Sequence, residues 1–323
     1  NTGAVAPNLY FASPTGYATI VGSLSGTIGV KRSGDADNYA VDPSKRNITK
    51  DYSKFNSSLG CFKADDSAYH VVQLRDGEVV LHCKRSSANW SYAVARSLAD
   101  KSTQTVTLEE NWVGTSGSLA GIYSTGFSQG RMYLPAGTSV ILNLGSYSIN
   151  RGLTSVNNYG SVMYICGTLT INGGSGTYIR GGYTNGYYSS TYGGGIHIAS
   201  GGNVTMNGGV IGKNTTTHSY AGAGVYVGSG AVFNLKSGYV GASGYANTAT
   251  NTYRAGGVYV ADGGVFNMSS NSANVIYNTA SNANSGGGIY VASGGTFNMT
   301  GGYIRYNTAS GATSGGGVYW AGV

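Results

Sequence analysis

The chain has 323 residues, of which 55 are glycine, 27 tyrosine and only four proline, and just 10% are charged. Glycine does not recur at every third position and the net charge is only +7, so a collagen-like or a charge-rich disordered chain is excluded. No run approaches the roughly 20 apolar residues of a membrane-spanning helix, so we expect no membrane span.

Residues 1–88 are predicted to form a small β-rich domain. The segment AYHVVQLRDGEVVLHCK, residues 68–84, has two alternating runs around Asp-Gly, which is the pattern of a β-hairpin. The segment TGYATIVGSLSGTIGVKR, residues 15–32, also has the pattern of strands. The chain begins at Asn1 and not at methionine, which fits a processed product or a fragment. A removed signal peptide would place the protein outside the cell.

Two cysteines lie in this first region. Cys61 and Cys83 would form a disulfide if the compartment is oxidising, and two unpaired buried thiols are the alternative. His70 and His82 flank the hairpin and would face each other across it. Because no third ligand lies at a suitable spacing, we expect a solvated pair and no metal site.

Residues 89–102, NWSYAVARSLADKS, are predicted to form an amphipathic helix. Trp90, Val94 and Leu98 recur at the spacing that places them on one helical face, and Asn89 or Ser91 would cap the first turn. A strand is expected directly afterwards, in TVTLEENW at residues 105–112.

From residue 103 onward the sequence repeats a glycine-rich motif. The segment GGGIYVASGGTFNMTGGYIRYNTA, residues 286–309, returns with small changes in earlier segments, and GGGVYWAGV at 315–323 opens another copy. Apolar residues alternate with a period of two, so each copy holds three short strands separated by glycine corners. The first inward residues of successive copies, 29 to 33 residues apart, are Met132, Met163, Ile196, Val225, Val258, Ile289 and Val318.

Three strands in about 30 residues, with no room for a crossover helix, predict an all-β fold, a parallel β-solenoid over residues 103–323. Like residues then stack from coil to coil. Asn214, Asn278 and Asn307 each precede a threonine, and we expect their amides to bond along the axis. Cys166 stands where other copies have a small residue, which favours packing over reactivity.

The frame GGGxYVxSGGxFNMxGGxIxxNTA resembles the glycine-rich repeats of right-handed parallel β-helices in large bacterial cell-surface proteins, including adhesin-like, wall-anchored proteins. RMYLPAGTSVILNLGSYSI at 131–149 and SVMYICGTLTINGG at 161–174 resemble their first coils. The resemblance implies a right-handed β-helix that the helix at 89–102 closes at its N-terminal end. It is weaker for function, because pectate lyases, adhesins and phage tailspikes share this architecture.

The solenoid is poor in groups for acid–base chemistry. Glycoside hydrolysis usually needs two carboxylates at one bond, and beyond Glu110 the only carboxylate is Asp262. We therefore expect no catalytic residue, no cofactor and no metal, and His197 and His218 also lack the spacing of a metal site. A degraded carbohydrate-active enzyme is the third-ranked hypothesis. The basic residues are too scattered for a nucleic-acid site: Arg131, Arg151, Arg180, Lys213, Lys236, Arg254 and Arg305.

One outward ladder, called the tyrosine ladder below, consists of aromatic residues at the same position of seven consecutive coils: Tyr133, Tyr164, His197, Tyr226, Tyr259, Tyr290 and Tyr319. Neighbouring rings would pack against one another and stabilise the sheet. The alternative is an aromatic strip that contacts another protein chain or a sugar surface.

The last copy stops one strand into a new coil, at Val318, Tyr319 and Trp320. An open coil exposes apolar core and unpaired strand edges, so we expect cover from a longer repeat chain or from the N-terminal domain of another copy. Head-to-tail contacts of the second kind build fibres. The leading hypothesis is a non-enzymatic extracellular structural protein, a subunit or shaft segment of a surface fibre. The alternative is a monomeric adhesin fragment that binds glycan or a cell-surface protein along the tyrosine ladder.

Overall fold

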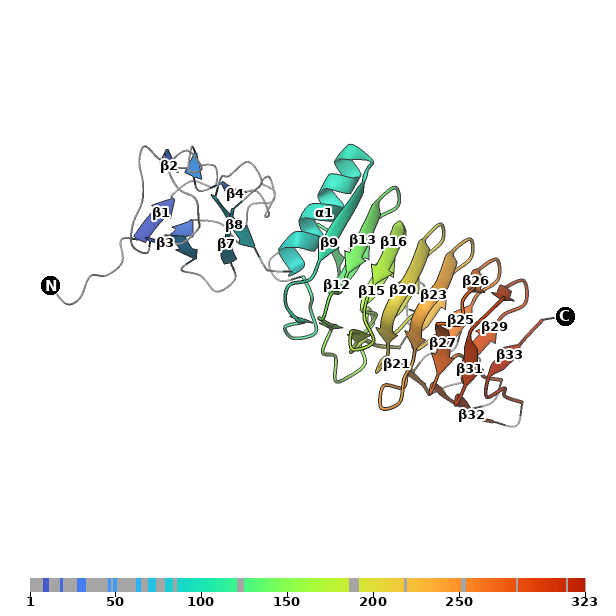
Figure 1. The fold of residues 1–323 in the computed structure, drawn as a ribbon. Helices are drawn as coiled ribbons and strands as arrows, with labels where there is room; N and C mark the ends of the chain where they lie inside the picture. The colour runs from blue at the N-terminus through green and yellow to red at the C-terminus, as the bar shows by residue number, and fades with distance from the viewer. Residues whose placement is uncertain are drawn as a thin grey trace. The chain divides into compact units, whose positions relative to one another are not determined.

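The computed structural model describes eight strands within residues 8–83 by their backbone, and residues 86–322 except 121–124, 186–191, 218–219, 251–253, 283 and 312 (Figure 1). The chain divides into two compact units, residues 1–92 and residues 93–323.

The first unit contains short strands, as predicted. β1 pairs with β3 and β3 with β6, all parallel, β2 pairs with β5, and β4, β8 and β7 form an antiparallel sheet. The predicted hairpin is confirmed as β7 and β8, with His70 directly opposite His82. The side chains of these histidines, and the pairing of Cys61 with Cys83, lie outside the described residues. The strand bounds are β1 Asn8–Phe11, β2 Ala18–Thr19, β3 Ile28–Arg32, β4 Arg46–Asn47, β5 Thr49–Lys50, β6 Phe62–Ala64, β7 Tyr69–Gln73 and β8 Val79–Cys83.

The predicted helix is present as α1, Ser86–Asp100, beginning three residues earlier than expected. Trp90 and Val94 are fully buried, and Leu98 is half-buried. Figure 1 shows α1 beside β9 at the N-terminal end of the solenoid. The Ser97 hydroxyl joins α1 to the neighbouring strand β13 (Ser139–Asn143), because it accepts from the backbone N–H of Ser139 at 2.8 Å.

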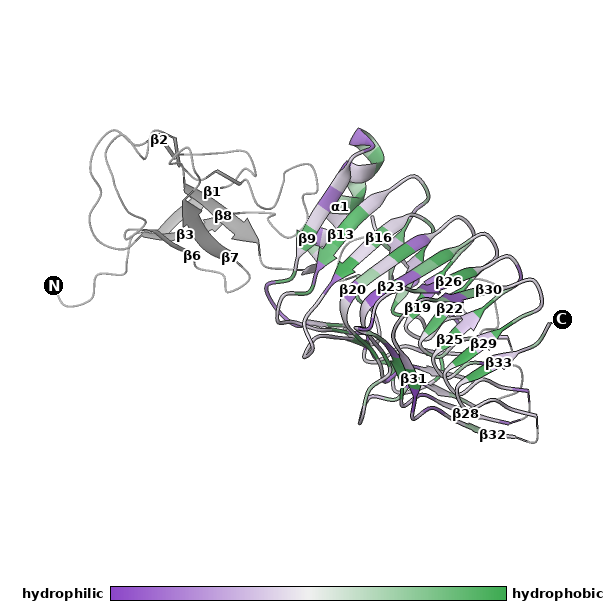
Figure 2. Ribbon diagram, turned by 45° about the vertical axis from the view of Figure 1, so that its right-hand side comes forward, coloured by the Kyte–Doolittle hydropathy of each residue, from purple (hydrophilic) through white to green (hydrophobic). Residues whose placement is uncertain are grey.

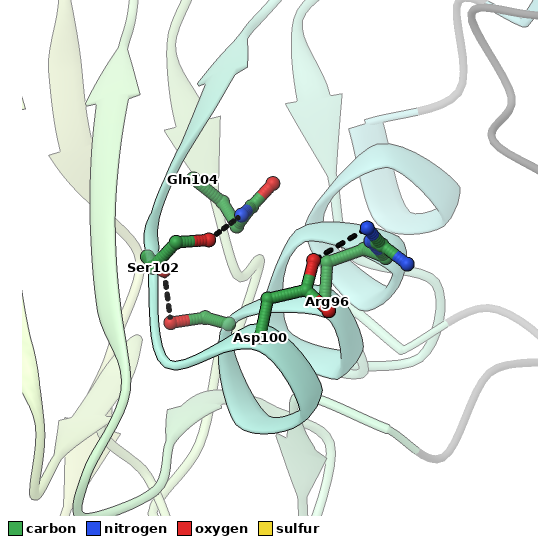
Figure 3. A network of polar contacts seen from close by, with 5 residues as sticks. Arg96, Asp100, Ser102 and Gln104 are labelled. Atoms are coloured by element: carbon green, nitrogen blue, oxygen red, sulfur yellow. Dashed lines mark hydrogen bonds and ion pairs between the residues drawn. The ribbon is translucent and has the colours of Figure 1, made fainter.

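Polar contacts hold the end of α1 (Figure 3). Arg96 and Asp100 form an ion pair one turn apart, and the Ser97 hydroxyl donates to the Ser102 carbonyl at 2.9 Å. The Gln104 amide donates to the Ser102 hydroxyl at 2.7 Å. Lys101 adopts a left-handed conformation, with φ of 54°, and this ends the helix. The chain can therefore turn directly into the first solenoid strand.

The second unit is a parallel β-solenoid of about six coils, as predicted. The first strand of each coil belongs to an eight-stranded sheet in which all pairings are parallel except that of β11 with β12. Its strands are β11 Phe127–Ser128, β12 Arg131–Leu134, β15 Met163–Ile165, β19 Ile196–Ile198, β22 Val225–Val227, β25 Val258–Val260, β29 Ile289–Val291 and β33 Val318–Trp320.

The second and third strands of each coil belong to one twelve-stranded sheet, because β20 and β23 run through both rows. The second row contains β9 Thr103–Thr107, β13 Ser139–Asn143, β16 Thr168–Asn172, β20 Asn203–Ile211, β23 Val232–Val240, β26 Val265–Met268 and β30 Thr296–Met299. The third row contains β10 Trp112–Val113, β14 Ile149–Asn150, β17 Tyr178–Arg180, the second halves of β20 and β23, β27 Ala273–Ile276 and β31 Tyr303–Arg305.

A fourth row, which the repeat pattern did not indicate, follows the three expected strands. It forms a five-stranded parallel sheet of two- and three-residue strands directly after the third-row turns. These strands are β18 Tyr183–Thr184, β21 Thr215–Thr216, β24 Thr248–Ala249, β28 Thr279–Ser281 and β32 Thr308–Ser310.

The core consists of stacked identical or similar side chains. In Figure 2, hydrophobic and hydrophilic residues alternate along second-row strands such as β20, β23 and β26. Phe233 lies opposite Phe266, their ring centroids 5.2 Å apart, and both are fully buried. Each coil therefore buries the apolar face of the next one, at the spacing of about 4.8 Å between paired strands.

Buried asparagines close the turn after the third row. Asn214 donates to the Asn247 side chain at 3.1 Å, Asn247 to Asn278 at 2.9 Å, and Asn278 to Asn307 at 3.0 Å. The predicted amide stack is thus confirmed, and Asn247 is a fourth member. We call these four residues the asparagine ladder. Its amides also donate to backbone carbonyls, for example from Asn278 to Ile276 within its own turn at 3.1 Å and from Asn247 to Ile211 of the preceding coil at 2.8 Å.

Glycines bend the strands that span two rows. In β20 the backbone turns at Gly208 and Gly209, with φ of 157° and 88°, and in β23 at Gly238, with φ of 96°. These values lie in or near the region that only glycine adopts readily. The bend gives the outer face of the sheet a concave line along the solenoid.

Candidate functional site

The seven residues of the tyrosine ladder lie in register in the first-row strands, as predicted. Ring centroids of successive members are 4.8 to 5.7 Å apart. All pairs stack except those of His197, whose ring is steeply inclined to Tyr164 and tilted to Tyr226. The stack therefore runs the length of the first-row sheet and is interrupted only at the histidine.

Much of the ladder is covered, which differs from the expected outward strip. His197, Tyr259 and Tyr290 are at most 4% exposed, and the other four members are half-buried. Tyr192 lies over the ladder, with its ring centroid 5.0 Å from that of Tyr226, and Ala255 packs against Tyr259 and Tyr290. Segments that lead into the strands thus fold over the rings. The covered members contribute to packing, and an accessible aromatic surface exists only at the half-buried ones.

His197 was expected as a surface member of the ladder, and this expectation is wrong. Its ring is buried among Tyr164, Tyr192 and Tyr226, and its Nδ1 accepts from the backbone N–H of Tyr192 at 3.1 Å. Burial, with a smaller effect from the charge of Arg131, lowers the pKa of His197 to about 3. The ring is therefore a neutral packing element at physiological pH.

Two buried arginines support the N-terminal end of the ladder. The Arg131 guanidinium lies 4.2 Å from the Tyr164 ring centroid and donates to the Ser161 hydroxyl at 3.3 Å. Arg151 donates to backbone carbonyls, among them that of Gln129 at 2.9 Å. Burial lowers the pKa of Arg131 to about 10 and that of Arg151 to about 9. Both remain cationic at neutral pH and hold the surrounding loops together.

Cys166 is a half-buried thiol beside the ladder. It hydrogen-bonds with the hydroxyls of Tyr164 and Tyr133, and burial raises its pKa above the usual value. A thiol with a raised pKa is a poorer nucleophile at neutral pH because less thiolate is present. The surroundings thus favour the packing role expected from the sequence.

A second aromatic row, absent from the sequence predictions, lies on the outer face of the third-row strands. Tyr178 pairs in register with Val210, Val210 with Tyr239, Tyr239 with Asn274 and Asn274 with Tyr303. Tyrosine thus returns at every second coil. The tripeptide Tyr-Ile-Arg, which occurs at both 178–180 and 303–305, is the feature of the sequence that could have indicated it.

Two separate hollows lie beside this row on the outer face, the second of them at the glycine bends, and together we call them the outer groove. The first, of about 350 Å³, is lined by Asn111, Ser148, Tyr178, Arg180 and Tyr245 with their neighbours. The second, of about 430 Å³, is lined by glycines and serines of successive bends and by Tyr239, Asn271, Asn274, Tyr303 and Arg305. The groove is concave, polar and aromatic.

No protein-family model, curated protein or solved structure matches this chain.

In the described part of the chain, no group of three His, Cys, Asp or Glu side chains is placed to hold a metal ion. The helix in this part is too short and too polar to cross a membrane. His218 lies outside the described residues.

The predicted assembly end is open on its core side. Val318 is 37% and Trp320 54% exposed, and Tyr319 is half-buried. In the second row Met299 is 42% exposed, whereas its partner one coil earlier, Met268, is buried. Within the described residues, no further strand pairs with the outer edge of β30 or β33.

Proposed function

We propose that this chain is a non-enzymatic structural protein whose solenoid is lengthened by a further β-structure stacked on its last coil. The proposal is supported by the in-register apolar ladders, which a further strand stacked on β30 and β33 would extend by the same contacts. The partner is a second copy of the chain, docking through its N-terminal β-rich unit, so that subunits join head to tail into a fibre.

The chemistry of the last coil supports this proposal. Val318 and Met299 occupy ladder positions that are apolar in every coil, so a stacked strand would remove apolar area from water at about 25 cal/mol per Å². The third-row strand of the last coil, β31, pairs with β27 on one side and, within the described residues, with no strand on the other side. Such edges readily accept another strand. The contact joins two different surfaces, the last coil of one subunit and the N-terminal unit of the next. Each added subunit therefore leaves one surface of each kind free at the ends of the assembly, where further subunits can bind.

A structural role also agrees with the scarcity of acid–base groups. Asp262 is the only carboxylate after Glu110, and a glycosidase-type mechanism usually needs two. The extracellular, cell-surface setting is part of the proposal and rests on the resemblance of the repeat to glycine-rich surface proteins.

The test is the state of the purified chain at high concentration, measured by light scattering and electron microscopy. We expect filaments whose axial repeat is close to the length of one subunit. Val318→Lys places a charge in the stacking face and should abolish them, whereas Val156→Lys, at a 46% exposed side chain in a loop of an early coil, should not. Circular dichroism of both variants reports on folding. Separate particles of the unaltered chain at every concentration would rule out head-to-tail assembly.

A further inference from the structure

The outer groove lies away from the stacking face and has its own chemistry. Its tyrosines recur at every second coil, at Tyr178, Tyr239 and Tyr303, with Val210 and Asn274 between them. At about 4.8 Å per coil, the backbone positions of these tyrosines repeat at about 9.6 Å. The Tyr178 ring stacks on Tyr245, with ring centroids 4.1 Å apart, so one of its faces is covered. An extended polymer with a similar repeat would match this spacing of attachment points.

The groove combines ring faces with polar groups and an open floor. Asn271, Asn274 and Ser272 line its second hollow beside Tyr239 and Tyr303. Glycines at the bends leave the floor without side chains, so a ligand can approach the backbone closely. Amphipathic rings beside amide and hydroxyl groups suit a ligand that is apolar on its ring faces and rich in hydroxyls at its edges, which is the chemistry of a saccharide.

The fixed charges of the groove are positive. Arg180 lines the first hollow and Arg305 the second, and no carboxylate lines either one. The Arg305 guanidinium lies 4.9 Å from the Tyr303 ring centroid, and Lys213 lies 4.7 Å from that of Tyr245. Guanidinium groups pair with carboxylates through two parallel hydrogen bonds, so these side chains favour an acidic ligand.

We propose that the outer groove binds an acidic polysaccharide in an extended β-linked conformation. In such a chain alternate sugars present the same face, and the disaccharide repeat is comparable with the two-coil spacing of the tyrosines. The Tyr239 and Tyr303 rings and the stacked Tyr178–Tyr245 pair contact alternate sugars. Asn271 and Ser272, which are exposed, bond to hydroxyls, and Arg180 and Arg305 pair with carboxylates.

Two other polymers fit the groove less well. A peptide usually adds to a sheet through unpaired backbone groups at an edge, and the groove lies on the face of paired strands. A single-stranded nucleic acid would also stack on tyrosines, but it carries a phosphate at every nucleotide, and the arginines lie at opposite ends of a row of five paired strands. An acidic sugar at every second residue needs fewer cations.

The experiment is calorimetric titration of the full chain with hyaluronan oligosaccharides long enough to span the groove. Neutral cello-oligosaccharides, polyglutamate and single-stranded DNA of similar length are the comparison ligands. We expect hyaluronan to bind at least tenfold more tightly than each of them. Equal binding of the neutral sugar, tighter binding of polyglutamate or DNA, or no binding of hyaluronan would overturn the proposal.

Variants locate the site. Tyr239→Ala and Tyr303→Ala should each weaken hyaluronan binding about tenfold, and Arg180→Gln combined with Arg305→Gln should remove the preference for the acidic sugar. Tyr220→Ala, at a 53% exposed tyrosine that lines neither hollow, is the matched control. Because Tyr303 and Arg305 are exposed, their variants should fold. Unchanged affinity in both tyrosine variants would overturn the assignment to this groove. Repeating the titration on Val318→Lys separates sugar binding from fibre assembly.

Discussion

The Asn247 side-chain amide donates to the Asn278 side-chain oxygen at 2.9 Å, and both residues are fully buried at the turn that ends the third row. This contact joins two coils by a bond that runs along the solenoid axis. The same amide also donates to the Ile211 carbonyl. One side-chain amide thus bonds to the coil before it, at Ile211, and to the coil after it, at Asn278.

Replacing Asn247 by alanine should destabilise the solenoid strongly. The change removes the donor to Asn278 and Ile211 and the acceptor used by the Asn214 amide. Because buried partners are left unsatisfied, we expect a loss of about 3 kcal/mol in the free energy of unfolding, measured by urea denaturation. Asn298→Ala, in an exposed asparagine that donates only to Asn267 at 2.9 Å, should cost less than about 0.5 kcal/mol. Equal losses in the two variants would contradict the role of the ladder.

The buried tyrosines should matter through their rings. Tyr259 stacks on Tyr226 and Tyr290 at 5.5 and 4.9 Å between centroids, so Tyr259→Ala leaves a cavity and should cost about 3–5 kcal/mol. Tyr259→Phe keeps the ring and should cost less than about 1 kcal/mol. Tyr319, with one ladder neighbour and a half-buried ring, supplies the control, since Tyr319→Ala should cost clearly less. Thermal unfolding of the three variants ranks them, and a Tyr319→Ala loss as large as that of Tyr259→Ala would argue against the ladder as packing.

Alkaline pH should unfold the protein through the same rings. Burial is the main cause that raises the pKa of Tyr226 to about 12, against about 10 in an unfolded chain. A raised pKa means that this stabilisation is complete below about pH 10 and is lost as the pH rises through about 12. Ultraviolet absorbance of tyrosinate should show a late ionisation step that coincides with loss of circular dichroism. Tyr226→Phe should reduce that step, and early ionisation of every tyrosine would contradict the burial.

Low pH should destabilise the folded protein through protonation of His197. Its pKa is about 3 in the folded chain and about 6.5 in an unfolded one, so the unfolded state takes up a proton first as the pH falls. The stabilisation is present above about pH 6.5 and is lost between that pH and about 3, at up to about 1.4 kcal/mol per pH unit. Urea unfolding between these limits should show the slope, and His197→Phe should flatten it. An imidazole that titrates near pH 6.5 by NMR in the folded protein would refute the assignment.

Glycine is required where coils touch. A Cβ at Gly182 would collide with the backbone carbonyl of Gly194, whereas a Cβ at Gly176 would meet nothing within 4 Å. Gly182→Ala should therefore destabilise by about 3 kcal/mol, and Gly176→Ala should have little effect on the free energy of unfolding. Comparable melting temperatures of the two variants would show that the contact is relaxed more easily than the structure indicates.

The sequence by itself determined the solenoid, its coil length and the register of its ladders. Side chains along a strand alternate between inward and outward with a period of two. In stacked coils an inward residue such as Phe233 packs against the residue at the same position of the next coil, Phe266. Residues that recur in the sequence motif therefore occupy equivalent positions in successive coils. For the same reason the tyrosine ladder and three members of the asparagine ladder could be placed from the motif alone.

Only the tertiary structure decided which of these ladders is open to solvent. Tyr192 and Ala255 lie in segments between the strands, and the repeat motif does not specify the course of these segments. Both residues pack against the first-row ladder, whose members His197, Tyr259 and Tyr290 are buried. Likewise, the glycine bends in β20 and β23 form a hollow on the outer face of the sheet that brings Tyr239 and Tyr303 together. Periodicity fixes whether a side chain points inward or outward, but exposure depends on what packs over it, and that is set by contacts between distant parts of the chain.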